Sequence, residues 1–313
     1  ISEPESLAWF QARSLEPIRR SASRNLWRVR CPPGLQPEDL VARSAGAPGL
    51  DEVFANVIAR VAATTPNDDF YSSQWALPKI KANLAWDLTK GSTSIVVAVL
   101  DTGVALTNPD LTANLWKNPG ELGKSGGVDD DANGYVDDIY GYDFLRNDGS
   151  PNDESGHGSC VTGVVGAVGN NAEGVAGVAW NVKLMNLKFM GPAGEGSVAD
   201  AIEAIDYARL KGAKIINASW TISGSSPTEL QNAVQRANTA GILIAAAAGN
   251  AASNNNTTPV YPANYTTGNV ISVAASDIND EYYSLTNWGS TTVHLAAPGV
   301  EVLSTNIYTS GTW

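Results

Sequence analysis

Short, mainly apolar runs mark the chain after residue 66 and predict strands that are covered on both faces of a sheet. These runs are Ile95–Leu100, Val182–Phe189, Ala213–Ala218, Gly241–Ala247 and Val270–Ala274. Segments with helical periodicity lie between them, as where Val198, Ile202 and Ile205 recur on one helix face after Ser197. The alternation predicts an α/β fold with three layers, in which helices cover both faces of a mainly parallel central sheet (αβα).

Residues 1–65 follow a different pattern and predict a separate, smaller unit. A strand is expected at Leu26–Arg30, a helix at Pro37–Ser44 and a second strand at Glu52–Val61. This segment has eight Arg, no Lys and seven acidic residues, a net charge of +1, whereas residues 66–313 carry a net charge of −13. We therefore expect a small α+β domain over 1–65 and a larger α/β domain over 66–313.

Composition and charge narrow the functional classes. A hydrophobic content of 43% with 17% charged residues is typical of packed globular domains. The net charge of −12 disfavours a nucleic-acid partner, because a phosphate backbone would be repelled. No stretch reaches the roughly 18 apolar residues of a membrane span. Cys31 and Cys160 lie far apart, and we expect both to be free thiols.

Three short motifs carry candidate chemistry at or near the ends of predicted strands. Asp101 lies in V-L-D-T-G, His157 in S-G-H-G-S and Asn250 in A-A-G-N. Catalytic groups of parallel α/β folds gather at the carboxyl ends of the strands. His157 is the candidate base in a chain with two histidines, and a carboxylate such as Asp101 would favour its charged form. Simpler interpretations remain: D-T-G and G-N as turns, and His157 as a structural histidine.

In this order, and with A-A-P-G at Ala296–Gly299, the motifs resemble the subtilisin-like serine proteases, thermitase-like members in particular, from about Pro66 onwards. The resemblance implies a secreted serine endopeptidase that acts on polypeptides through an Asp-His-Ser triad. Asp101 and His157 would supply two triad members, and Asn250 would donate its amide to the oxyanion.

The resemblance also places the substrate. A peptide would add along Ser219, Trp220 and Thr221 by backbone hydrogen bonds. Part of the pocket for the residue before the scissile bond would come from Ala247, Ala248 and Gly249. Thr221 stands where the family usually has glycine, which puts side-chain preference in question. Cys160 replaces the second histidine of the usual H-G-T-H run and is expected to be a small buried hydrophobe; the alternative is a thiol whose modification would block the site.

The triad serine is expected outside the sequence given. The family nucleophile lies in G-T-S-M-A after A-P-G, whereas this chain reaches Gly311-Thr312-Trp313 with Trp in the serine position. Ser310 precedes the glycine and is in the wrong order. We expect the serine to follow Trp313, so that the chain as given is inactive. The alternative is a non-catalytic, peptide-binding homologue without a nucleophile.

The first segment resembles the carboxyl part of a subtilisin-type propeptide, which assists folding and covers the cleft. The resemblance rests on Trp27-Arg28-Val29, the Pro-Gly after it and the Asn56-containing segment. Cleavage is expected near residues 62–66. An ordinary N-terminal extension is the alternative.

Calcium is the expected cofactor, at two sites. The D-x-D-x-N-G run offers alternating oxygen ligands and a turn glycine, although Tyr140 replaces the usual glutamate at position twelve. Its candidate ligands are Asp129, Asp131, Asn133, Tyr135, Asp137 and Asp138. A solvated acidic turn is the alternative. The second site follows from the resemblance alone, with Asp68, Asp110 and Asn171 as side-chain ligands and carbonyls near Val168, Glu173 and Val175.

An aspartic protease is the remaining enzymatic alternative, because D-T-G also suits that class. It would need two carboxylates that share a proton and an all-β body. The chain has one D-T-G and an alternating α/β pattern, which argues against it. His294 is expected on a buried strand, in a structural role.

Overall fold

The computed structural model describes residues 3–22, 26–48, 50–56, 63–124 and 126–307. The chain forms two compact units, residues 1–62 and 63–313, so the division falls three residues before the boundary expected from the sequence. Ser310 and the G-T-W triplet lie outside the described residues. In the part of the chain that is described, no helix has the length and apolar character required to cross a membrane.

The first unit contains two helices and a hairpin. In chain order these are α1 (Glu3–Gln11), β1 (Glu16–Arg20), β2 (Trp27–Arg30) and α2 (Pro37–Ser44). The two strands pair antiparallel, and the Phe10 ring packs edge-on against Trp27 with the ring centroids 5.4 Å apart. The expected α+β character is present, and α2 has the predicted bounds.

The predicted strand at 52–61 is wrong where it can be compared. Residues 52–56 form no strand, because β1 and β2 pair with each other and no described residue of the unit pairs with this segment. Residues 57–61 lie outside the described residues.

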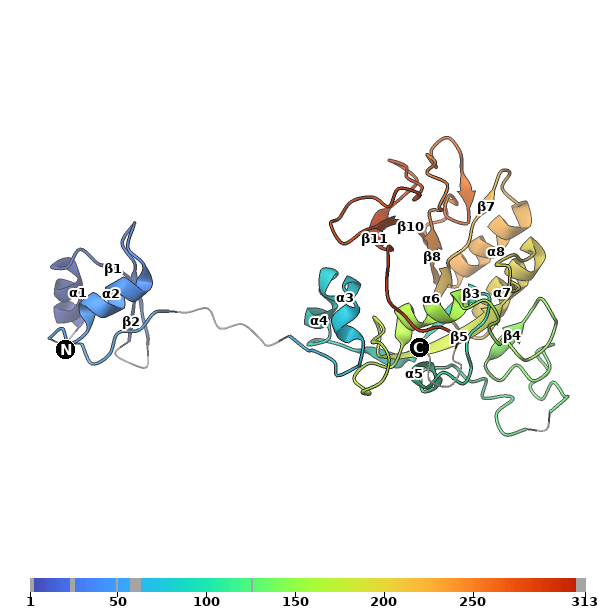
Figure 1. The fold of residues 1–313 in the computed structure, drawn as a ribbon, viewed down its shortest axis with the longest axis horizontal. Helices are drawn as coiled ribbons and strands as arrows, with labels where there is room; N and C mark the ends of the chain where they lie inside the picture. The colour runs from blue at the N-terminus through green and yellow to red at the C-terminus, as the bar shows by residue number, and fades with distance from the viewer. Residues whose placement is uncertain (1–2, 23–25, 49, 57–62, 125, 308–313) are drawn as a thin grey trace. The chain divides into compact units, whose positions relative to one another are not determined.

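The second unit is built on a seven-stranded sheet (Figure 1), in the order β11-β10-β8-β6-β3-β5-β4. Every neighbouring pair is parallel. In chain order the strands are β3 (Gly91–Asp101), β4 (Gly141–Asp143), β5 (Asn181–Lys188), β6 (Ile215–Ala218), β8 (Leu243–Ala247), β10 (Val270–Ser276) and β11 (Leu295–Pro298). The predicted α/β class with a mainly parallel sheet is confirmed.

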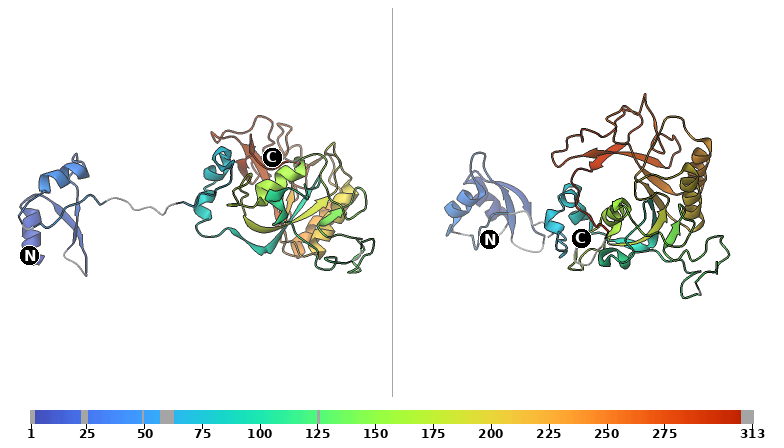
Figure 2. Two further views of the ribbon diagram at one scale, coloured as in Figure 1. Left: turned by 60° about the horizontal axis from the view of Figure 1, so that its bottom comes forward. Right: turned by 45° about the vertical axis from the view of Figure 1, so that its right-hand side comes forward.

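Helices cover both faces of the sheet, which makes three layers (Figures 1 and 2). Successive residues of a strand face opposite sides. Ala98 and Leu100 of β3 pack in the core with α7 (Val198–Leu210) and α8 (Thr228–Thr239), whereas Val97 packs on the side of α6 (His157–Gly166). Shorter elements complete the unit: η1 (Tyr71–Ser73), α3 (Ala76–Lys79), α4 (Ala82–Ala85), α5 (Pro109–Thr112), β7 (Ile222–Ser223) and β9 (Val260–Tyr261).

The expected burial of His294 is wrong. It precedes β11 and is exposed, because β11 is an edge strand with no described strand beyond it. Its backbone N–H donates to Ser272 O at 3.0 Å, and its Nδ1 accepts from Ser272 N–H at 2.8 Å. These contacts fit the structural role that was expected for this histidine.

Candidate active site

Asp101 and His157 form a hydrogen-bonded pair, although 56 residues separate them. Asp101 ends the central strand β3, and its side chain is 1% exposed; His157 begins α6, and its side chain is 52% exposed. The distance from His157 Nδ1 to Asp101 Oδ1 is 2.7 Å. No hydrogen bond from a described residue reaches the opposite ring nitrogen, Nε2, which is therefore available to a substrate or a nucleophile.

Glycines allow the strand end and the helix start to approach this closely. A side-chain carbon on Gly158 would collide with the carbonyl oxygen of Gly103. Gly103 itself has φ +110°, a conformation that other residues rarely adopt. Gly158, the residue after His157, thus lets the two backbones pack.

The pKa of His157 is raised above its usual value. The hydrogen bond to Asp101 is the largest cause, partial burial opposes it, and the charges of Asp101 and Asp153 add to it. The stabilisation that the charged ring gives the fold is complete below the unfolded pKa near 6.5 and is lost as pH rises through the higher folded pKa. A neutral, proton-accepting ring therefore requires a higher pH than free imidazole does.

Asn250 follows β8 in a loop at the same carboxyl edge of the sheet. Its side chain is exposed and makes no hydrogen bond to other described residues, so its amide is available as a donor. Gly249 before it has φ +109°, and a side-chain carbon there would collide with the amide of Asn287. The turn at Gly249 thus requires a glycine, and it presents the exposed amide of Asn250 at the end of β8.

The expected substrate strand follows β6, on the edge where β3 and β8 also end. Ser219 accepts a hydrogen bond from Asn217 at 2.9 Å, and Trp220 is buried against Phe189 with ring centroids 5.2 Å apart. Thr221 is exposed. At the end of β8, Ala247 and Ala248 pair with β10, and Ala248 O accepts from Asn255 at 2.8 Å. The parallel order thus places all the predicted substrate residues on one edge.

Cys160 lies one helical turn after His157 and is half-buried. Burial raises the pKa of its thiol, which is therefore protonated at neutral pH. Both cysteines are free, as predicted.

Asp68 and Asp110 are buried carboxylates held by the 168–175 loop. Asp68 Oδ2 accepts from Asn170 N at 2.7 Å, and its other oxygen is buried and has no hydrogen-bond partner among the described residues. Asp110 accepts from Asn171 Nδ2 at 2.9 Å and from Val175 N at 2.8 Å. Burial, together with repulsion from Asp68 and Glu173, raises the pKa of Asp110 to about 6 despite these donors. Two neighbouring buried carboxylates, one of them with an oxygen that accepts no hydrogen bond from a described residue, are suited to bind a cation.

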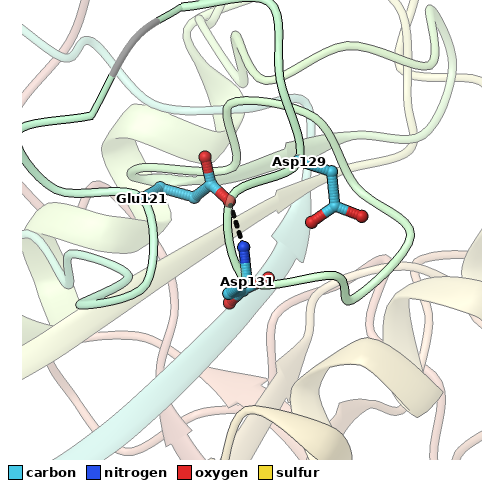
Figure 3. Close-up of side chains that lie close together, drawn as sticks. All are labelled: Glu121, Asp129 and Asp131. Atoms are coloured by element: carbon cyan, nitrogen blue, oxygen red, sulfur yellow. Dashed lines mark hydrogen bonds between the residues drawn. The ribbon is translucent and has the colours of Figure 1, made fainter.

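The D-x-D-x-N-G loop forms a different acidic group from the one expected (Figure 3). Asp129 and Asp131 gather with Glu121, and the ligand oxygens lie within 4.8 Å of one another. Glu121 is 2% exposed, and its Oε1 accepts from Asp130 N at 2.9 Å and from Asp131 N at 3.3 Å. Its Oε2 is buried, and no residue in the described part of the chain hydrogen-bonds to it. The sequence missed Glu121 because it lies outside the motif.

The later residues of that loop have other partners. Asp137 accepts from Gly127 N, and Asp138 is buried among Asn118, Asn133 and Tyr207. Tyr135 donates its hydroxyl to Glu203 at 3.1 Å. Lys211 reaches Asp131 at 2.6 Å. This lysine partly neutralises the acidic group, so a cation would compete with it for Asp131.

Lys188 ends β5 beside Asp101 and is fully buried. Its Nζ donates to Asn152 O at 2.6 Å and Glu154 Oε2 at 3.1 Å, and lies 3.7 Å from the buried Asp143. It thereby fastens the loop that leads to His157 onto the sheet.

Lys188→Met should lower the free energy of unfolding by about 3 kcal/mol, because a buried carboxylate loses its compensating charge. Chemical denaturation measures this. Lys183→Met is the matched control, since Lys183 lies on the same strand and its ammonium contacts Ala113 O in an exposed setting. Equal losses in the two variants would contradict the importance of the buried group.

Comparisons with known proteins identify the family and the fold. The model of the Subtilase family (Peptidase S8) matches residues 92–313. The thermophilic serine proteinase of Bacillus sp. (strain AK1) is 38% identical over 78% of this chain and 54% of its own length. Thermitase of Thermoactinomyces vulgaris is 37% identical over 77% of this chain and 76% of its own. The chain thus spans about half the length of the first of these relatives.

A solved structure shares the fold at comparable identity. A protease from Pseudoalteromonas arctica PAMC 21717 has a TM-score of 0.61 and 31% identity over 75% of this chain and 73% of its own. A cold adapted subtilisin-like serine proteinase gives a TM-score of 0.53 at 26% identity, covering 69% and 66%.

Proposed function

Because the chain belongs to the subtilase family of serine peptidases, we propose that it acts as a secreted serine endopeptidase, made as a precursor, that cleaves polypeptides with Asp101, His157 and a serine. The observation that carries this proposal is the 2.7 Å contact of His157 Nδ1 with Asp101 at the end of the central strand. The serine belongs to the G-T-S-M-A motif that the family resemblance places after Gly299.

Each residue has a defined part in the proposed reaction. His157 Nε2 takes the proton of the serine hydroxyl as that oxygen attacks the carbonyl carbon, and later gives the proton to the leaving amine. Asp101 holds Nδ1–H and stabilises the charged ring. The free amide of Asn250 donates to the oxyanion. Ser219, Trp220 and Thr221 align the peptide, while the exposed Thr221 side chain narrows the choice of residue opposite it.

The decisive experiment uses the full-length gene product. A serine-directed phosphonate should label one serine and abolish hydrolysis of a casein substrate, while pepstatin should have no effect. Inhibition by pepstatin alone would favour the aspartic class. Peptide binding without labelling or turnover would favour a non-catalytic homologue.

The first unit is proposed to act as the propeptide of this precursor. Its support is that residues 1–62 form a separate compact unit with its own helices and hairpin. Cleavage near residues 62–66 would release it.

We also propose structural calcium. At the first site Asp68, Asp110 and Asn171 would hold the ion, with carbonyls near Val168, Glu173 and Val175, and the unpartnered oxygen of Asp68 is the feature that fits it. At the second, the ligands would be Glu121, Asp129 and Asp131. The ion would supply positive charge that offsets the repulsion of these carboxylates.

Adding a chelator should lower the melting temperature by roughly 5–10 °C at about pH 8, if free calcium is about a hundred times its dissociation constant. The shift should shrink at about pH 5. With its pKa raised to about 6, Asp110 binds a proton below that pH and loses its charge for the ion. Differential scanning calorimetry checks both arms.

Asp110→Asn should reduce the fall in melting temperature that a chelator causes at about pH 8. Asp200→Asn, on the surface of α7, should leave that fall unchanged. An identical melting temperature with and without chelator at both pH values would contradict both sites.

A further inference from the structure

Asp153, in the loop before α6, is a buried carboxylate that the triad does not include. Its Oδ1 accepts from Thr102 Oγ1 at 2.9 Å, Ser155 N at 2.9 Å and Gly156 N at 3.1 Å. Its Oδ2 accepts from Ser159 N at 2.9 Å and Ser159 Oγ at 2.7 Å. The Asp153 side chain thus accepts hydrogen bonds both from backbone N–H groups at the start of α6 and from the hydroxyl of Thr102, the residue after β3.

These contacts form a bridge parallel to the Asp101–His157 hydrogen bond. Thr102, next to Asp101, donates its hydroxyl to Asp153 and accepts from Gly158 N, next to His157, at 2.9 Å. Ser159 Oγ also accepts from Ala105 N at 2.9 Å. The neighbours of the two paired residues are therefore bound to each other through Asp153, which fixes the distance between strand end and helix start.

Asp153 also brings a second negative charge to His157. Burial opposes its ionisation, but hydrogen bonds from Ser159, Ser155 and Gly156 outweigh burial and lower the pKa of its carboxyl. It therefore stays ionised wherever His157 titrates. Its charge acts on the ring in the same direction as that of Asp101.

The other groups around α6 contribute little charge at the ring. Glu154 is occupied by Arg146 and Lys188. Cys160 is held neutral by burial. The segment after β11 presents hydroxyls to the helix, with Ser304 donating to Cys160 O and Thr305 to Ser159 O, both at 2.7 Å. Among the described residues, Asp101 and Asp153 are thus the charges that act on His157.

We propose that Asp153 is a positioning residue for His157: it holds the start of α6 against the end of β3 and sets the pH at which the imidazole titrates. This inference deepens the proposed function and rests on His157 as the base. An N-terminal helix cap without influence on the ring is the competing interpretation.

The test measures the imidazole directly, without turnover, in the 313-residue chain. The chain has two histidines, so ¹⁵N-edited NMR yields two titration curves, with His294 as the internal reference. Asp153→Asn should move the midpoint of His157 to lower pH, because a negative charge is lost, and leave His294 unchanged. An unchanged His157 midpoint would overturn the proposed electrostatic role. Because no nucleophile is needed, the result is separable from the proposed peptidase activity.

Ser159→Ala is the matched control. It removes hydrogen bonds to the same carboxylate and to Ala105 N but keeps the charge and the bridge through Thr102. It should lower the melting temperature and leave the midpoint of His157 in place. A shift as large as that of Asp153→Asn would mean that any damage to the cap moves the ring, which would overturn the specific role of Asp153.

Thr102→Val tests the positioning role and serves if Asp153→Asn does not fold. It keeps both charges and breaks the bridge at its centre. In the protein carrying the serine, kcat/KM should fall about ten- to a hundredfold, as expected for a small misplacement of a catalytic group. The low-field Nδ1 proton signal should broaden. A folded Thr102→Val variant with unchanged kcat/KM and an unchanged signal would overturn the positioning role.

Discussion

Asp101→Asn should lower kcat by about 10⁴-fold in the protein that carries the serine, with KM changed far less. The asparagine would present an amide in place of the acceptor for Nδ1–H, and the ring would be left in the wrong tautomer without support for its charge. The 2.7 Å contact makes this expectation specific to Asp101. Steady-state kinetics with a chromogenic peptide measure it.

Asp206→Asn is a suitable control for this effect. Asp206 is also a partly buried, ion-paired aspartate, held by Arg236 at 2.5 Å on the opposite side of the sheet from α6. It should keep full kcat and lose at most about 1 kcal/mol of stability. A fall of less than tenfold in kcat for Asp101→Asn would remove Asp101 from the reaction.

Asn250→Leu has the second largest expected effect, a loss of about 10²–10³-fold in kcat. The amide is exposed and unpaired among the described residues, so its removal should disturb the fold little. Its donor is needed when negative charge develops on the substrate oxygen, and KM should therefore stay nearly constant.

The comparison for Asn250 is Asn232→Leu on the exposed face of α8, which should leave kinetics unchanged. A rise in KM with kcat unchanged for Asn250→Leu would indicate a role in ground-state binding instead of in the transition state.

The centre of the sheet was predictable because β5 and the second half of β3 are buried on both faces, which leaves an apolar signal in runs such as Ile95–Leu100. The hairpin strand β1 (E-P-I-R-R) and α1 have no such signal, since each buries few of its residues in a small unit. His294 had apolar neighbours but lies beside an edge strand, and edge position is decided by topology.

The candidate site likewise has residues that the sequence predicted and residues that it did not. Motif order indicated Asp101, His157 and Asn250, but their distances depend on how β3 and α6 approach. Asp153 and Glu121 were not predicted because each lies in a loop and its hydrogen-bond partners depend on how that loop folds. No spacing in the sequence indicates those partners.

The loop that carries the acidic group is closed at its base. Asn118 N donates to Ile139 O at 2.8 Å, and the Asn118 side chain is hydrogen-bonded to the buried Asp138. The two ends of this loop are therefore fastened to each other, and inside it Tyr135 and Asp131 are held by Glu203 of α7 and by Lys211, the residue after α7. A change in the length of this loop would therefore disturb α7, which lies on the opposite face of the sheet from α6, before it reached the Asp101–His157 pair.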